Sequence, residues 1–303
     1  MGQAKIRRQA EMDRAAATAQ VTSARIAIIE WLDENERHTG TELKKRLENR
    51  PDHQLLTELY ICRTKDDVFR AIVSITQSVR ARGTPILHIE AHGSTDYSGF
   101  IGPTGELVTW EELSDPLRAL NVATRFNLVV IAAACLSEAI LFAVEMQKPL
   151  PYLAAVCFRT QVTPHRLFEA MLELYRALIM EKLPLATAVE RADRELSESE
   201  FLRYTSIPML LKSAAEKSLS DVDHGNFNAY YARMAARVRV ATGRSIQYTP
   251  AEFARVVRAA AIKAVGSALH RCLDYDRFPE NRYRFGFDPK EFVDEWLRMQ
   301  RIR

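Results

Sequence analysis

A histidine and a cysteine each end an apolar stretch and are the residues of this chain best suited to chemistry. His92 and Gly93 close the run PILHIEAHG, and Cys135 closes the run NLVVIAAAC. A thiol is mostly protonated near neutral pH, and a neighbouring imidazole can accept its proton to give a thiolate nucleophile. The pair predicts nucleophilic catalysis if the fold brings the two side chains together.

The surrounding sequence alternates apolar stretches with helical ones, which predicts an α/β domain. The expected strands are 24–32, 55–63, 85–92, 127–135 and 152–158. The last two of them, NLVVIAAAC and YLAAVCF, are almost continuously apolar, as is typical of strands covered on both faces. We therefore predict a three-layer domain in which helices enclose a mainly parallel sheet.

Local signals place the helices and one hairpin of this domain. Thr39 with Glu42, and Thr64 with Asp67, have the spacing of capping boxes, and Gly83 is expected to end the second of these helices. Other helices are expected at 110–121, at 136–148, and from points near Thr163-Pro164 and Leu183-Pro184. The glycine-bearing turns of SGFIGPTGELVTW predict a small hairpin after His92.

Both candidate residues occupy the carboxyl ends of strands, where ligands bind in an open parallel sheet. Consecutive parallel strands joined by a right-handed crossover are expected to be neighbours, which would bring His92 close to Cys135. A helix beginning at Leu136 would add its positive end to the site. Gly93, having no side chain, would allow close approach of the backbone, and its N–H would join that of Cys135 as an oxyanion hole.

Beyond about residue 200 the strands are expected to stop. The remaining sequence is predicted to be helical, most clearly in TPAEFARVVRAAAIKAVGSALHR at 249–271. We therefore divide the chain into a polar, alanine-rich leader at 1–23, the α/β domain at 24–199, and an all-α C-terminal domain at 200–303.

Composition indicates an ordinary folded protein. The chain has 303 residues, 47% of them hydrophobic, and its net charge of +3 is the difference between 42 basic and 39 acidic residues. This balance favours neither nucleic acid nor membrane as a partner. Basic residues outnumber acids between Arg233 and Arg271, but exposed helix faces normally carry such charge, so we expect no functionally important nucleic-acid binding.

The sequence carries no motif for a metal, a nucleotide or an export signal. The start of the chain has no apolar signal region and no stretch reaches membrane-spanning length, so we predict a cytoplasmic protein. Four cysteines without a CxxC pair fit reduced thiols better than disulfides or a zinc site. The loop DENERHTGTELK lacks a phosphate-binding glycine pattern, and we predict no cofactor.

Taken together, the order of elements, HIEAHGS, the hairpin, VVIAAACLSEA and FEAMLELYRALIMEKLPLATAVERA resemble the caspase-like fold of clan CD cysteine peptidases. Within that clan the chain looks most similar to the bacterial CHAT domains, over roughly residues 24–197. The resemblance implies a Cys135–His92 dyad that hydrolyses peptide bonds without metal or organic cofactor. It also implies a protein substrate and control by a partner or signal in bacterial defence or regulated cell death.

The chain departs from two specificity patterns within the clan. Ala133, Leu136 and Ser137 replace the Gln, Arg and Gly of the caspase signature QACRG, so cleavage after Asp is not indicated. Many relatives that cleave after basic residues carry an acid two positions before the cysteine, and position 133 is not acidic. Cleavage after Arg or Lys is therefore not indicated by this pattern either.

Other polar residues near the strand ends have two interpretations each. Asp96, after the histidine, and Arg159, past the next strand, are tentative substrate-binding residues, although a solvated surface position is the favoured interpretation of each. His88 and Glu90 share a strand face with His92 and would either orient the dyad or make core hydrogen bonds. For the whole chain, the alternative to a peptidase is an inactive caspase-like scaffold whose helical C-terminus binds a partner.

Overall fold

The fold is given by a computed structural model, which describes residues 25–49, 55–142, 144–145, 147–197, 200, 202–206, 232, 236, 239–240, 243, 250–285 and 287–301. The chain divides into two compact units. The first comprises Met1–Glu145 and Leu150–Ile207, and the second comprises Met146–Pro149 and Pro208–Arg303. The leader expected at 1–23 lies outside the described residues.

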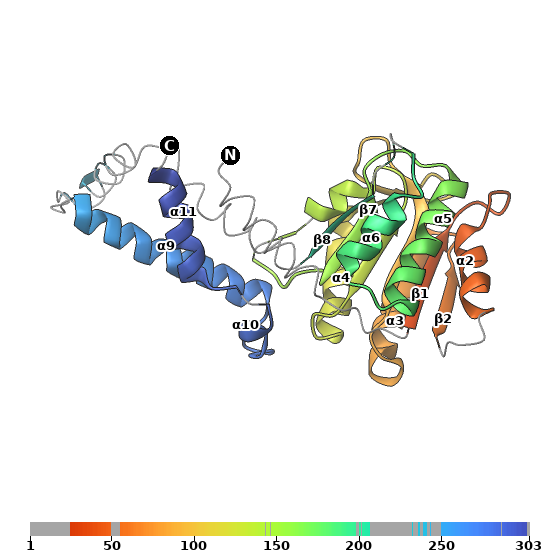
Figure 1. The fold of residues 1–303 in the computed structure, drawn as a ribbon, viewed down its shortest axis with the longest axis horizontal. Helices are drawn as coiled ribbons and strands as arrows, with labels where there is room; N and C mark the ends of the chain where they lie inside the picture. The colour runs from red at the N-terminus through yellow and green to blue at the C-terminus, as the bar shows by residue number, and fades with distance from the viewer. Residues whose placement is uncertain are drawn as a thin grey trace. The chain divides into compact units, whose positions relative to one another are not determined.

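The first unit is built on one mostly parallel sheet (Figure 1). Its strands are β1 (Arg25–Trp31), β2 (Leu56–Ile61), β3 (Ile86–Gly93), β6 (Val129–Ala133), β7 (Ala154–Phe158) and β8 (Leu202–Ser206), with a hairpin of β4 (Gly99–Ile101) and β5 (Leu107–Thr109). The order is β2-β1-β3-β6-β7-β8, and only β8 runs antiparallel to its neighbour in this series. The five predicted strands, the hairpin and the mainly parallel sheet are confirmed.

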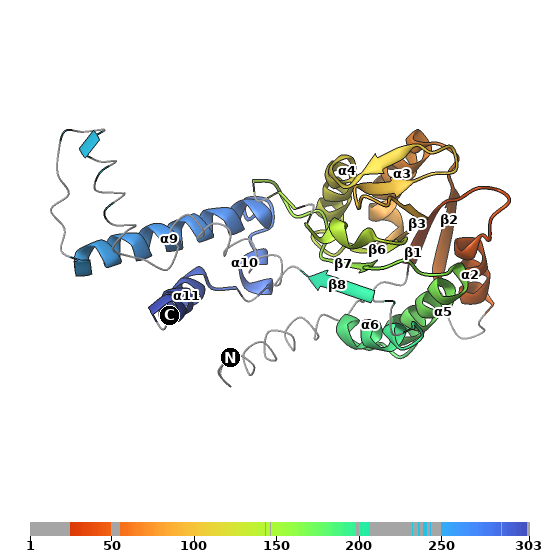
Figure 2. The ribbon, with the colours of Figure 1, turned by 90° about the horizontal axis from the view of Figure 1, so that it is seen from above.

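Helices cover both faces of the sheet, so the unit has three layers (Figure 2). They are α2 (Thr39–Glu48), α3 (Lys65–Arg82), α4 (Trp110–Ala123), α5 (Pro164–Tyr175) and α6 (Leu185–Asp193). Helices α3 and α4 lie on one face, while α2, α5 and α6 lie on the other (Figure 2). The capping box predicted for Thr64 and Asp67 is present at α3, and Thr163 caps α5 as expected.

Burial explains the uninterrupted apolar runs of the central strands. Every residue of β1, β6 and β7 is buried. On one face these strands pack against Leu43 and Leu47 of α2 and against α5 and α6. Each fully buried aliphatic side chain stabilises the fold by about 1.5–3 kcal/mol, and a sheet with helices on both faces gains this at nearly every position.

The strands do not stop at residue 200, contrary to expectation. Strand β8 pairs antiparallel with β7 and forms an edge of the sheet. Its sequence, LRYTS, has only five residues and alternates in polarity, so it lacks the apolar run that marks the central strands. An edge strand needs to bury little more than one face, and here Leu202 is buried and Tyr204 is partly buried against the same core.

The first turn of α2 is capped by a different residue from the one predicted. His38 precedes the helix without a side-chain cap, and no capping box forms at Thr39. Instead, the buried carboxylate of Glu30, on β1, accepts the backbone N–H of Thr41 at 2.7 Å and the Thr41 hydroxyl at 3.0 Å. Glu42 binds Arg37 through both carboxylate oxygens. A carboxylate from a neighbouring strand therefore satisfies this helix end and interacts favourably with its dipole.

The described part of the second unit consists of helices and turns. They are α9 (Pro250–Cys272), α10 (Asn281–Arg284) and α11 (Pro289–Arg301). Helix α9 packs against α11, and an ion pair joins Arg258 to Asp294. The helix predicted at 249–271 is confirmed, whereas much of the all-α domain predicted at 200–303 lies outside the described residues. Among the residues described, none of the helices combines the length and apolarity needed to cross a membrane.

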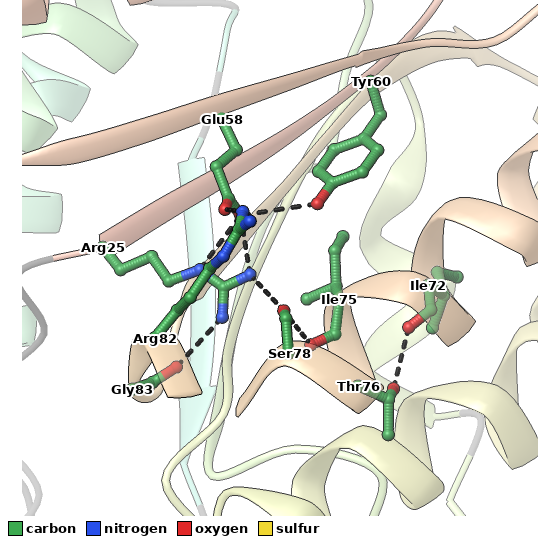
Figure 3. A network of polar contacts seen from close by, with 9 residues as sticks. All are labelled: Arg25, Glu58, Tyr60, Ile72, Ile75, Thr76, Ser78, Arg82 and Gly83. Atoms are coloured by element: carbon green, nitrogen blue, oxygen red, sulfur yellow. Dashed lines mark hydrogen bonds and ion pairs between the residues drawn. The ribbon is translucent and has the colours of Figure 1, made fainter. Parts of the chain in front are cut away.

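A buried arginine ties the amino end of the sheet to the end of α3 (Figure 3). Arg25 is 1% exposed and binds Glu58 of β2 with Nε at 3.0 Å and Nη2 at 2.6 Å. It also donates to Ser78 and to the carbonyl of Gly83, where α3 ends. Burial alone would raise the pKa of Glu58, but hydrogen bonds from Arg25 and Arg82 outweigh it and hold the pKa below its usual value.

We predict that Arg25→Ala destabilises the first unit by about 3 kcal/mol, because it leaves a partly buried carboxylate short of its main partner. Arg82→Ala, which removes an exposed guanidinium from the same Glu58, is the matched control and should cost much less. Urea denaturation followed by circular dichroism measures both. Because the pKa of Glu58 is lowered by folding, the cost of Arg25→Ala should shrink as pH falls below the usual glutamate range. Equal costs for the two variants would contradict this account.

Candidate active site

The carboxyl ends of β3 and β6 meet, as the sequence predicts. The two strands are parallel neighbours paired as far as Glu90 and Ala133. Strand β3 then continues for His92 and Gly93, which pair with β4 of the hairpin. A methyl group placed on Gly93 would lie 1.6 Å from the carbonyl oxygen of Cys135. Glycine is therefore required because the backbone of Gly93 closely approaches that of Cys135.

His92 and Cys135 line one cavity of about 200 Å³ at this edge of the sheet. The other walls come from the β1–α2 loop, from the ends of β3 and β6, and from the start of α5. A space of this size is smaller than a typical drug-binding pocket and suits a single long side chain. The two residues that the sequence nominates for chemistry thus face a common cavity.

Glu36, in the β1–α2 loop, binds the imidazole of His92. His92 Nε2 lies 3.0 and 2.9 Å from the two carboxylate oxygens of Glu36, and both side chains are about half exposed. A carboxylate only accepts hydrogen bonds, so Nε2 carries the proton and Nδ1 is the basic nitrogen of the neutral ring. Sequence reasoning missed Glu36. The signal that identifies it is its position in a loop that follows the carboxyl end of β1, at the same edge of the sheet.

The thiol of Cys135 contacts the segment that leads into α5. The backbone N–H of Val162 donates to Sγ at 3.3 Å, and Sγ lies 3.5 Å from the carbonyl oxygen of the same residue. Of the four cysteines, all free, Cys135 alone is not buried. The thiol of Cys135 is therefore both partly exposed and held by the backbone of the segment before α5.

The chain after Cys135 does not form the α-helix predicted at 136–148. Leu136 adopts a left-handed conformation with φ of 55°, and a short 3₁₀ helix, η1 (Ser137–Phe142), follows. The hydroxyl of Ser137 lies within 2.9 Å of the carbonyls of Ala132 and Ala134, and it accepts the N–H of Phe158. Serine bonded to nearby backbone in this way competes with helix formation. The positive end of the α-helix predicted after Cys135 is therefore not part of the site.

This turn stores backbone strain beside the thiol. A left-handed conformation costs a non-glycine residue about 1–2 kcal/mol, and the buried contacts of Ser137 hold Leu136 in place. Strain of this kind persists only where the surrounding structure over-determines the conformation, and it is frequent at functional sites.

Asp96 and Arg159, the tentative substrate-binding residues, do not line the cavity. Asp96 accepts hydrogen bonds from the hydroxyl and backbone N–H of Ser98, and these bonds lower the pKa of Asp96. The exposed Arg159 lies 3.6 Å from Glu138. Any substrate contact by either residue would therefore fall outside the cavity.

His88 and Glu90 do not orient the imidazole, because Glu36 occupies that position. His88 is fully buried, and its Nδ1 lies 3.1 Å from the hydroxyl of Tyr175, which is the core hydrogen bond that the simpler interpretation predicts. Glu90 is also buried but lines the cavity.

Comparison of the sequence with protein-family models gave no match, and comparison with curated proteins gave none either. The geometry of this edge of the sheet is therefore the main basis for assigning a function.

We predict that brief treatment of the native protein with iodoacetamide near pH 7 labels Cys135 before the other three cysteines. Burial raises the pKa of Cys62 to about 12 and also raises the pKa of Cys157, and Cys272 is buried. His92→Ala should slow labelling at Cys135 alone, because it removes the base. Peptide mass spectrometry measures each site, and labelling of Cys135 only after denaturation would contradict the assignment.

Proposed function

We propose that the first unit is a cysteine endopeptidase in which Cys135 is the nucleophile and His92 its base. The observation that carries the proposal is the shared cavity, which both side chains line at the ends of adjacent parallel strands. The resemblance of HIEAHGS and VVIAAACLSEA to the caspase-like CHAT domains supports the same roles. Cysteine–histidine pairs in other folds act by this chemistry, in which an imidazole generates the thiolate.

In the proposed reaction the two ring nitrogens of His92 have different roles. His92 Nδ1 takes the proton from Sγ of Cys135, and the thiolate attacks the peptide carbonyl carbon. The protonated ring, held by Glu36 through Nε2, then gives its proton to the leaving amine as the peptide C–N bond breaks. Water, deprotonated by the same nitrogen, cleaves the thioester and restores the thiol. The backbone N–H groups of Gly93 and Cys135 are the proposed donors to the oxyanion.

The wider role comes from the resemblance alone. A protein substrate, control by an activating partner or signal, and a place in bacterial defence or regulated cell death are all properties of the CHAT proteins that the sequence resembles. Four free cysteines suit the reducing cytoplasm, where we place the protein. In the alternative of an inactive scaffold, the helical C-terminus is the proposed surface for a partner.

Cys135→Ala and His92→Ala should each abolish cleavage of a responsive protein substrate, because each removes a reacting group while leaving the buried core untouched. Cys157→Ala is the matched control, since that thiol lies within β7 and does not line the cavity. Gel analysis of substrate cleavage and thermal melting of each variant provide the readouts. Retained turnover in either dyad variant would favour the inactive-scaffold alternative.

Glu36→Ala should lower kcat by about 10- to 100-fold with a smaller change in KM, because its main effect is to release the imidazole of His92, although Glu36 also lines the cavity. Glu34→Ala, two positions earlier in the same loop, is the control and should leave kcat unchanged, as its carboxylate lies at the surface near Arg63. Steady-state kinetics on a cleavable peptide separates the two parameters. An effect confined to KM would instead assign Glu36 to substrate binding.

A further inference from the structure

Two glutamates lie side by side beneath the candidate active site. Glu30 of β1 and Glu90 of β3 are register partners on adjacent parallel strands, and both are buried. A methyl group on Gly40, in the first turn of α2, would lie 2.6 Å from Oε2 of Glu90 and 2.9 Å from Oε2 of Glu30. Both carboxyl groups therefore pack against the start of the same helix.

Of these two glutamates, only Glu30 has a hydrogen-bond partner for each of its carboxylate oxygens. The carboxylate of Glu30 binds Thr41 twice and lies 2.7 Å from Nδ1 of His38. Glu90 Oε2 has no hydrogen-bond partner, although the residue is only 3% exposed. The nearest basic atom, Nε2 of His88, is 3.8 Å away, too far for a hydrogen bond, and is itself unsatisfied. Leaving a buried polar atom unpaired is costly, so such an atom calls for an explanation.

Glu90 differs from Glu30 in a second respect, because it lines the cavity that contains Cys135. Apolar side chains of Leu32, Val162 and Leu167 form much of the remaining wall. Arg37 also lines the cavity, and its guanidinium makes two hydrogen bonds to Glu42. The cavity thus combines apolar walls, a partly exposed thiol and a buried carboxyl group whose Oε2 makes no hydrogen bond.

The register of the sheet places an acidic residue beside the position that is acidic in many relatives with basic specificity. The position two residues before Cys135 is Ala133, which is not acidic. Its direct partner across β3 and β6 is Glu90, two residues before His92. Both residues line the cavity, so the small side chain of Ala133 leaves space that the carboxyl group of Glu90 faces from the neighbouring strand.

We infer that this cavity receives the side chain of a lysine or arginine whose carbonyl is attacked by Cys135, and that Glu90 pairs with its cationic group. The inference rests on the proposed peptidase function and names its substrate class. The aliphatic stem of a basic residue matches the apolar walls, and its charged head supplies the missing partner of Oε2. An acidic side chain would meet like charge, and an apolar one would leave the carboxyl unsatisfied.

The charges around Glu90 are compatible with the binding of a lysine or arginine side chain. Burial raises the pKa of Glu90 and Glu30 adds to the rise, whereas His88 opposes it. A cation bound beside the carboxyl would favour its ionised form and offset the effect of burial. The first turn of α2 would stabilise the same negative charge.

A binding experiment tests the inference without requiring cleavage. N-acetyl-lysine methylamide and N-acetyl-arginine methylamide should protect Cys135 of the full-length protein from iodoacetamide, whereas the N-acetyl-norleucine and N-acetyl-glutamate methylamides should protect it at least about 10-fold less well. Glu90→Gln preserves the shape of the side chain and should abolish the preference for lysine over norleucine. Glu30→Gln, which removes the neighbouring charge outside the cavity, should retain it. Equal protection by lysine and norleucine, no protection by any compound, or an unchanged preference in Glu90→Gln would overturn the inference.

Cleavage assays separate this inference from the proposed function. Fluorogenic peptides that differ only in having Lys, Arg, norleucine or Glu before the scissile bond should show hydrolysis after the basic residues, and Glu90→Gln should lower kcat/KM for these at least about 30-fold. Cation-selective protection without any hydrolysis would count against the peptidase and leave the cation pocket standing. Hydrolysis after norleucine or Glu in preference to Lys and Arg would support a peptidase and reject the pocket.

Discussion

The close approach of β3 and β6 at their carboxyl ends constrains the rest of the candidate site. The backbone of Gly93 lies so near the carbonyl of Cys135 that no side chain fits between them. This is possible because β3 runs beyond its pairing with β6 and enters the hairpin with β4. Backbone packing thereby brings the histidine before Gly93 and the thiol of Cys135 to one cavity, and the loops after β1 and β7 complete its walls.

Buried charge is the second organising feature of the first unit, and it is handled in two ways. Arg25 with Glu58, and Glu30 with the first turn of α2, are charges whose partners lie within the fold. Glu90 Oε2 makes no hydrogen bond, and the imidazole of His88 lies 3.8 Å from it. Structural charges are normally paired because desolvation is expensive, whereas functional sites keep groups ready for a ligand. This contrast makes Glu90, and not Glu30, the candidate for recognition.

The turn after Cys135 contains a strained backbone conformation next to the thiol. Leu136 is left-handed, and Ser137 anchors the turn to the ends of β6 and β7. The N–H of Val162 then reaches the sulfur from the segment before α5. Activation of the thiol is therefore proposed to come from a base, and the helix dipole expected from the sequence has no part in it.

The sequence by itself determined the main strands of the sheet and which of them are neighbours. Continuous apolar runs identified β6 and β7, and strand order predicted that His92 and Cys135 end adjacent strands, because these signals are local and chain connectivity limits the topology. Only the tertiary structure decided which loop carboxylate binds His92, that Glu30 caps α2, and that Glu90 lies opposite Ala133. It also decided that LRYTS joins the sheet as β8. These features depend on register and on contacts between residues distant in the chain, and no local pattern of residue types specifies either.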